Sequence, residues 1–178
     1  MNLSRDEVRL VRPTPADAAV IAGWSRSAEE AARWCSRAEH PFPAAAVLRW
    51  WDADDVEPWL LVSERPRTPL AYGELWHDEE EDEVELARLI VAADRRRTGL
   101  GRLLVAGLVS EARASGRAAC CLRVAPDNTS ALALYRSAGF RDVDPDRSAA
   151  WNEGQPVAYV WLERLDFPSR GANHLPQG

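Results

Sequence analysis

The chain has 178 residues, of which 46% are hydrophobic, a length and composition typical of one globular domain with a substantial core. Basic residues number 22 and acidic residues 28, for a formal net charge of −6, which argues against a nucleic-acid-binding protein. No apolar run approaches the roughly 18 residues of a membrane span, and the N-terminus lacks a signal-peptide core. We therefore expect a soluble, cytoplasmic protein that does not bind membranes.

The cysteines and histidines show the pattern of neither a disulfide nor a metal site. The number of cysteines is odd: Cys35, Cys120 and Cys121. The last two are adjacent, and because neighbours on a strand point to opposite faces, they should not form a disulfide. The histidines are scattered without the spacing of metal ligands. All 22 basic residues are arginine, which excludes lysine-based chemistry. We expect reduced thiols and no bound metal.

In chain order, the first half of the sequence predicts a strand, then interrupted helices, then a hairpin of two strands: residues 7–14, 25–55, 58–64 and 69–78. Between the first strand and the interrupted region, Thr14 and Pro15 are typical of the N-cap and first position of a helix. An acidic run, residues 78–83, occupies the turn that follows the hairpin.

The second half predicts a strand, a helix, a strand, a helix and a last strand: residues 83–93, 99–116, 118–125, 128–140 and 157–165. In the first of these helices, leucines recur with helical spacing and Gly116 marks the end. The pattern indicates one α+β domain, residues 1–165, with a mixed sheet of about seven strands flanked by about four helices. The tail, residues 166–178, has no periodicity, and we expect it to be loose.

The stretch RRRTGLGRLL suggests a phosphate-binding loop between a strand and a helix. A P-loop is excluded because it needs a lysine, and a dinucleotide fingerprint because its third glycine is missing. What remains is R-x-x-G-x-G, from Arg96 to Gly101. The first turn of a helix presents unpaired N–H groups, and glycines let an anion approach the backbone closely. A plain strand-to-helix turn fits the same residues, so this stretch alone leaves both interpretations open.

A second motif follows the first after a predicted helix and strand. Its residues are Asn128, Ala131, Leu134, Tyr135, Gly139 and Phe140, in the pattern N-x-x-A-x-x-L-Y followed by G-F. The two motifs in this order resemble the GNAT superfamily of acyl-CoA-dependent N-acetyltransferases, in which Val91 would end the fourth strand. The resemblance extends over about residues 7–165 and is sharpest from Glu85 to Phe140.

The resemblance implies acetyl-CoA as co-substrate, with no metal. In the family, the fourth and fifth strands splay apart, and the pantetheine arm pairs with the backbone of the fourth strand. The residues that would then contact the pantetheine arm are Leu89, Ile90, Val91 and Asn128. The residues of the loop that would hold the pyrophosphate are Arg96, Arg97, Thr98, Gly99, Leu100 and Gly101.

The resemblance also implies two catalytic side chains. Tyr135 matches the tyrosine that protonates the departing thiolate, and a phenol with a pKa of about 10 is protonated at neutral pH. Glu85 would accept the proton of the amine, although a solvated carboxylate that continues the acidic run is an equal alternative. The N–H of Val91 would stabilise the oxyanion. Arg123 stands where the subgroup that acetylates ribosomal-protein N-termini has a glutamate, which disfavours that activity.

The acceptor is predicted only as a class. Five tryptophans of the early region could bind an amine cation or could be core residues: Trp24, Trp34, Trp50, Trp51 and Trp59. The acidic run could attract a cation or be a solvated face. We expect an N-acetyltransferase for a primary amine, of a small molecule rather than a peptide. The alternatives are a non-catalytic acyl-CoA-binding module and an unrelated α/β domain with chance motifs, and a homodimer is left open.

Overall fold

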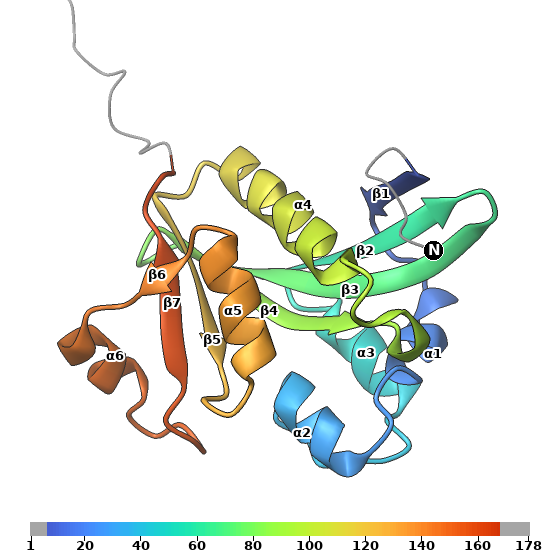
Figure 1. Ribbon diagram of the computed structural model, residues 1–178, viewed down its shortest axis with the longest axis horizontal. Helices are drawn as coiled ribbons and strands as arrows, with labels where there is room; N and C mark the ends of the chain where they lie inside the picture. The colour runs from blue at the N-terminus through green and yellow to red at the C-terminus, as the bar shows by residue number, and fades with distance from the viewer. Residues whose placement is uncertain (1–6, 168–178) are drawn as a thin grey trace, which may run out of the picture.

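The computed structural model describes residues 7–167 and shows a mixed sheet of seven strands in the order β1-β2-β3-β4-β5-β7-β6 (Figure 1). The strands are β1 (Val8–Val11), β2 (Val56–Glu64), β3 (Arg67–Asp78), β4 (Glu83–Val91), β5 (Ala119–Val124), β6 (Arg141–Asp142) and β7 (Val160–Arg164). Neighbouring strands are antiparallel except β4 and β5, which are parallel. The predicted α+β fold with a mixed sheet is confirmed.

Six α-helices accompany the sheet in the described part of the chain. They are α1 (Asp17–Ala22), α2 (Ala28–Cys35), α3 (Ala44–Trp50), α4 (Leu100–Ala114), α5 (Thr129–Ser137) and α6 (Pro145–Trp151), and a 3-10 turn, η2 (Ala93–Arg95), precedes α4. The expected number of about four was too low, and α6 in particular was missed. Its start signal is visible in the sequence, because Asp144 accepts the N–H groups of Asp146 and Arg147 and Pro145 is the first helical residue.

Two cores lie on opposite faces of the sheet. Leu104 and Leu108 of α4 pack with β3, β4, β5 and α5 on one face, and Ile21 and Val47 of α1 and α3 pack on the other. Side chains alternate across a strand, so β3 and β4 contribute to both cores. A Cβ at Gly73 would lie only 2.7 Å from the Cδ1 of Leu108, and α4 therefore packs directly against the backbone of β3.

The central feature for function is the divergence of β4 and β5. These strands pair only from Glu83, opposite Ala119, to Glu85, opposite Cys121. Beyond Glu85, β4 continues beside β3, whereas β5 turns away toward β7 (Figure 1). The second half of β4 therefore has one edge whose backbone groups pair with no neighbouring strand.

The packed part of the chain extends slightly beyond the predicted domain boundary at residue 165. Phe167 is buried in the core beside α4, and Asp166 accepts hydrogen bonds from Arg113 and Arg164. Asp166 and Phe167 were expected to be loose, and this expectation was wrong because an aromatic ring and an ion pair anchor them. Residues 168–178 and 1–6 lie outside the described residues. None of the described helices is long and apolar enough to cross a membrane.

Candidate active site

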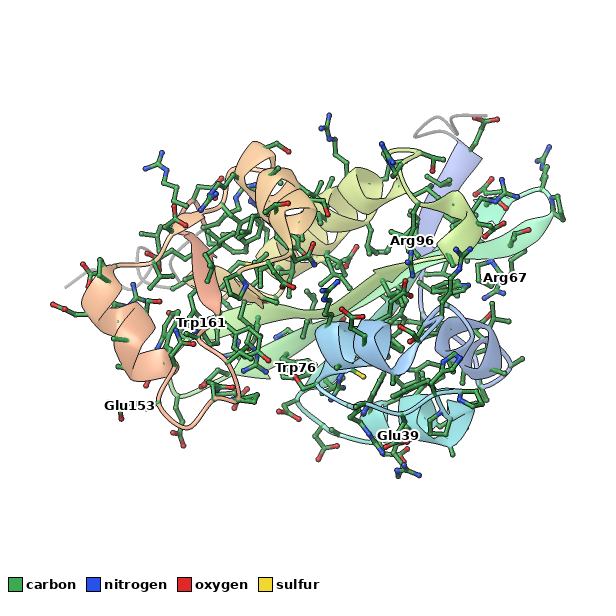
Figure 2. The ribbon with its side chains drawn as sticks, turned by 60° about the horizontal axis from the view of Figure 1, so that its bottom comes forward. Glu39, Arg67, Trp76, Arg96, Glu153 and Trp161 are labelled. Atoms are coloured by element: carbon green, nitrogen blue, oxygen red, sulfur yellow. The ribbon has the colours of Figure 1, made fainter. Side chains whose placement is uncertain are left out.

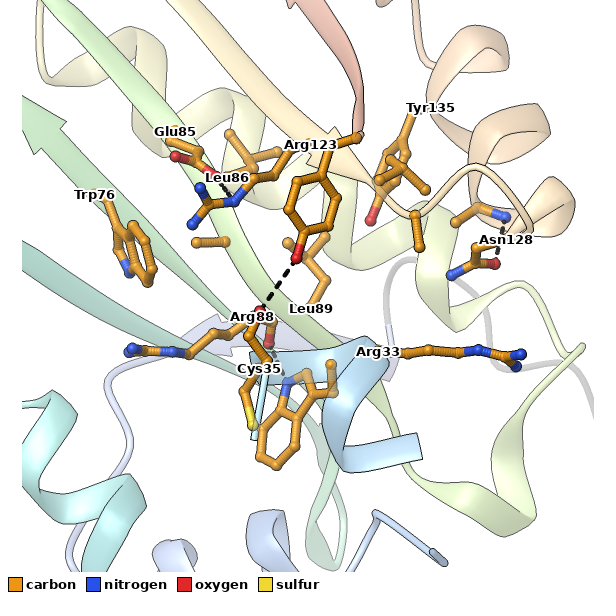
Figure 3. Close-up of a pocket in the computed structure, with 17 residues that line it drawn as sticks. Arg33, Cys35, Trp76, Glu85, Leu86, Arg88, Leu89, Arg123, Asn128 and Tyr135 are labelled. Atoms are coloured by element: carbon orange, nitrogen blue, oxygen red, sulfur yellow. Dashed lines mark hydrogen bonds and ion pairs between the residues drawn. The ribbon is translucent and has the colours of Figure 1, made fainter. Parts of the chain in front are cut away.

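A cavity of about 200 Å³ lies where β4 and β5 diverge (Figure 3). Its wall is formed by α2, β3, β4, β5, α5 and the segment before β7. Four residues expected at the site line this cavity together: Glu85, Leu89, Asn128 and Tyr135. They come from segments far apart in the sequence, and the divergence of the strands brings them around one space.

Glu85 lies at the last position where β4 pairs with β5, and on its other side it stands directly opposite Trp76 of β3. Its side chain is 18% exposed, and one carboxylate oxygen lies 3.3 Å from the Nε of Arg123. Burial raises the pKa of Glu85, while the positive charges of Arg123 and Arg88 lower it. A carboxylate this buried is unlike the solvated strand end that was the alternative, although its role as a base stays a prediction.

Tyr135 enters the cavity from α5, with its phenol pointing into the space (Figure 3). Its ring packs edge-on against Phe140, with centroids 6.2 Å apart. Burial raises the pKa of Tyr135 to about 12, so the hydroxyl carries its proton at neutral pH. A protonated phenol therefore lines the cavity, and its role as general acid stays a prediction.

Asn128 begins the helix that carries Tyr135. Its Oδ1 accepts hydrogen bonds from the N–H of Ala131 at 3.3 Å and the hydroxyl of Ser130 at 3.2 Å, so the side chain caps α5. The motif residue therefore has a structural task as well as the predicted one. Because the cap occupies Oδ1, a contact with a cofactor would use the Nδ2 amide.

The predicted phosphate loop lies at the start of α4, beyond the cavity wall. Within the described residues, no protein acceptor is found for the N–H groups from Thr98 to Gly101. Gly99 has a φ of +89° and open space around it, a conformation that glycine adopts at little cost. Gly101 serves another purpose, because a Cβ there would lie 3.3 Å from the Cδ2 of Leu134 on α5. The first glycine shapes the loop, and the second allows two helices to meet.

The side chain of Arg96 points away from the candidate phosphate position. Its guanidinium donates to both carboxylate oxygens of Glu30, at 2.9 and 3.2 Å, and to the carbonyl of Trp24 at 3.0 Å. It therefore ties the start of the loop to α2 and to the segment before it. Any contact of this loop with a pyrophosphate would come from the backbone N–H groups rather than from this guanidinium.

Four other predicted cofactor-binding residues have side chains that are directed elsewhere. Ile90 is buried in the core beneath α1 and α3, and Leu100 is buried against the sheet. Thr98 donates its hydroxyl to the carbonyl of Arg95 at 2.6 Å, and Val91 lies beside Gly101. The predicted contacts of these four residues would have to be made by the backbone, as the pairing with pantetheine requires, whereas the side chain of Arg97 is exposed.

The sequence analysis missed Trp76 and Arg88, both of which line the cavity. Neither residue belongs to a motif, and Trp76 reads as an ordinary strand residue. Of the five early tryptophans, Trp34 reaches this cavity, and its Nε1 donates to the carbonyl of Arg88 at 2.7 Å. Arg123 also forms part of the cavity wall. From the sequence alone it stood out only because one subgroup of the family has a glutamate at this position.

A second cavity, of about 300 Å³, adjoins the first and shares Trp76 and Glu85 with it. Its wall carries Asp78, Glu81 and Glu83 of the acidic run, with Trp151 and Trp161 on the side of α6 (Figure 2). Part of the acidic run therefore lies next to the candidate site. Within residues 7–167, no group of three or more His, Cys, Asp or Glu side chains is arranged to hold a metal ion, and the three cysteines are free.

Strands that diverge around a cavity, beside a helix start with free N–H groups, are the arrangement that the resemblance to acyl-CoA-dependent transferases implies. The chain belongs to the acetyltransferase (GNAT) family, whose model matches residues 25–140. The resemblance inferred from the two motifs is thereby confirmed.

Two curated relatives and one solved structure illustrate the similarity. A mycothiol acetyltransferase from Clavibacter michiganensis is 34% identical over 76% of this chain and 46% of its own length. The ribosomal protein bS18-alanine N-acetyltransferase of Escherichia coli is 41% identical over 34% of this chain and 41% of its own length. The match thus spans less than half of either relative. The PaiA N-acetyltransferase of Thermoplasma acidophilum, in complex with coenzyme A, shares the fold with a TM-score of 0.66 at 14% identity, covering 89% of this chain and 98% of that one.

Proposed function

We propose that the chain is an N-acetyltransferase that transfers the acetyl group of acetyl-CoA to a primary amine of a small molecule. The observation that carries this proposal is the convergence of Glu85 and Tyr135 on one cavity between diverging strands, in a member of the acetyltransferase family. A module that only bound acyl-CoA would need neither a buried carboxylate nor a phenol in that cavity.

The cofactor fits the backbone features of the site. The N–H groups from Thr98 to Gly101 have no protein acceptor in the described residues and would hold the pyrophosphate at the positive end of α4. The edge of β4 from Leu89 to Val91, which pairs with no neighbouring strand, would pair with the pantetheine arm as an added strand does, although the carbonyl of Val91 now accepts a hydrogen bond of 3.4 Å from Arg96 Nε. Asn128 would donate from Nδ2 to the same arm.

The chemistry divides two proton transfers between the two side chains. The amine nitrogen forms a bond to the thioester carbonyl carbon, and the C–S bond breaks. Glu85 accepts the proton that the nitrogen loses, directly or through a water, and Tyr135 gives its proton to the sulfur. The N–H of Val91 would stabilise the oxygen of the tetrahedral intermediate. Burial raises the pKa of Tyr135, and the same surroundings would raise the pKa of a thiol, so this transfer stays feasible.

The names of the two curated relatives indicate different reactions, one concerned with mycothiol and one with an alanine of ribosomal protein bS18. We favour a small molecule over a ribosomal N-terminus because Arg123 puts a positive charge where that subgroup has a carboxylate. A cytoplasmic location and a homodimer stay predictions of the same proposal.

The test is turnover with acetyl-CoA and a panel of primary amines, followed by thiol release and by mass spectrometry of the acetylated amine. We expect at least one amine to release coenzyme A and gain one acetyl group in equal amounts. Binding of acetyl-CoA without thiol release with any amine would instead favour the non-catalytic binding module.

A further inference from the structure

Arg88 reaches the candidate site because β4 contains a bulge. Arg88 and Leu89 together stand opposite the single residue Gly73 of β3, and Arg88 has a φ of +49°. In a regular strand, Arg88 would point to the face opposite Glu85, because side chains alternate. The extra residue returns Arg88 to the side of Glu85, while Leu89 packs toward α4. A left-handed conformation costs a residue with a side chain roughly 1 kcal/mol, so packing and hydrogen bonds must hold it.

A buried network holds the Arg88 side chain in one position. Its guanidinium lies between two indoles, 4.0 Å from the ring centroid of Trp50 and 4.7 Å from that of Trp76. Its Nη1 donates at 2.8 Å to Glu74, a fully buried carboxylate that also accepts from the Tyr72 hydroxyl at 2.5 Å and from Trp76 Nε1 at 2.6 Å. The guanidinium is therefore oriented before any ligand arrives.

Two guanidinium nitrogens of Arg88, Nε and Nη2, lie outside the network with Glu74. In residues 7–167, no acceptor is found for these two nitrogens. They are not fully buried either, because the one fully buried side-chain polar atom without a partner in these residues is Trp59 Nε1. The free donors of Arg88 are therefore accessible to a ligand. Figure 3 shows the Arg88 and Arg123 side chains extending to the side of Trp76, away from Asn128 and Tyr135. This is the end of the cavity that the cofactor motifs leave open.

We propose that Arg88 binds a carboxylate of the acceptor, so that the substrates of this enzyme are amines that carry a carboxylate group, such as amino acids. The inference rests on the proposed function and specifies its acceptor. A planar guanidinium with two free N–H donors can bind the two oxygens of a carboxylate in a bidentate arrangement. A neutral or cationic group does not offer two negatively charged acceptor atoms. Arg123, on the same side of the cavity, adds positive charge, and Glu85 lies beside both arginines to meet the amine.

The acidic second cavity makes a different acceptor the main rival. A diamine could place one ammonium group among Asp78, Glu81 and Glu83 and the other at Glu85. We favour the carboxylate because Arg88 and Arg123 line the same cavity as Tyr135, whereas the three acidic residues line the second cavity. The rival predicts that dications are the better substrates, and one experiment can therefore separate the two.

The experiment compares each common L-amino acid with its own carboxamide, and both with 1,4-diaminobutane, as acceptors in the acetyl-CoA assay. For wild type we expect kcat/KM to be about 10- to 100-fold higher for the preferred amino acid than for its amide, the usual range for a charge-assisted hydrogen bond. Arg88→Gln should bring this ratio to within about threefold of unity. The intrinsic reactivities of the two amines cancel when their ratio is compared between the two proteins.

The matched control is Arg49→Gln, which removes an exposed arginine of the neighbouring helix α3 and should keep the wild-type ratio. Arg88→Gln leaves the buried Glu74 without its charge partner, so the double variant Arg88→Gln/Glu74→Gln is measured as well and should lose the preference in the same way. Equal or better turnover of amides or of the diamine by wild type would overturn the inference while leaving the proposed function intact.

If no amine is acetylated, the proposed function fails, and binding then decides the inference separately. Quenching of tryptophan fluorescence reports equilibrium binding, since Trp50 and Trp76 flank the guanidinium. Tighter binding of amino acids than of their amides, abolished by Arg88→Gln, would support the anion site without turnover. Equal binding, or none, would overturn it.

Discussion

At the scale of single residues, the pKa of Glu85 depends on burial and on the positive charge of Arg123. The two side chains lie 3.3 Å apart, and the positive charge lowers a pKa that burial raises. Removing the charge in Arg123→Gln should raise the pKa of Glu85 further. Because a base must be deprotonated, activity falls as the pH drops through its pKa, and the acidic limb of the kcat/KM profile should therefore move to higher pH in this variant.

The measurement is kcat/KM against pH with one amine for wild type, Arg123→Gln and Glu85→Gln. Using one amine keeps the titration of the substrate the same in all three profiles. Glu85→Gln should lose the acidic limb that belongs to the enzyme, with a lower rate throughout. An acidic limb with the same midpoint in all three proteins would show that Glu85 is not the base.

Tyr135 offers the second prediction at this scale. Tyr135→Phe keeps the ring that packs against Phe140 and removes the only proton donor on this ring. General acid catalysis contributes about 10² to 10⁴ in rate, so kcat should fall by that order. The KM for acetyl-CoA should change little, because the hydroxyl acts mainly in the transition state.

The control for Tyr135→Phe is Tyr159→Phe, which removes another hydroxyl from the same cavity wall. The Tyr159 hydroxyl pairs with that of Ser36 at 3.2 Å, so its loss should cost less than about threefold in kcat. Steady-state kinetics on both variants decides the matter. A Tyr135→Phe enzyme within about twofold of wild type would exclude this phenol as the acid.

At the scale of elements, the loop before α4 depends on the conformation of Gly99. Gly99 and Gly154 both have positive φ, +89° and +74°, and at each of them an added Cβ would have no neighbouring atom within 4 Å. Alanine at either site should therefore cost about 1 kcal/mol of stability from backbone strain alone. Only Gly99→Ala should also weaken acetyl-CoA binding, because it alone displaces the N–H groups at the start of α4.

Urea unfolding and calorimetric titration with acetyl-CoA test this pair of variants. We expect similar losses of unfolding free energy and a Kd for acetyl-CoA raised about tenfold or more in Gly99→Ala only. Equal Kd values in both variants would mean that the loop does not bind the cofactor.

Elements with strong local signals were predictable from the sequence, and those shaped by tertiary contacts were not. Helix α4 and the helix from Asn128 to Gly139 follow from periodicity and caps. The bulge at Arg88 has no such signal in its own strand, because β4 contains no glycine and the residue is held by Trp50 and Glu74 from other elements. The side chain with the clearest bearing on the acceptor was therefore invisible before the fold was known.

At the scale of the whole molecule, the pattern of strands and helices predicted the mixed sheet, and the family resemblance carried by two motifs implied the divergence of its strands and the gap between them. The motifs could not predict which residues each motif side chain contacts in the folded protein. Arg96 matched the phosphate pattern, yet it binds Glu30, a residue 66 positions away that the fold brings to it on α2. The acidic run likewise lies beside the site only because β3, β4 and α6 meet there.

The central claim is that acetyl-CoA lies between the diverging strands with its pyrophosphate on the start of α4. Backbone hydrogen exchange with and without saturating acetyl-CoA tests it directly, since exchange reports the protection of individual N–H groups. We predict that exchange slows about tenfold or more in residues 97–101 and along the open edge of β4, residues 86–91, while the hairpin turn at residues 64–67 is unchanged. Saturating acetyl-CoA with no added protection in either segment would contradict the account.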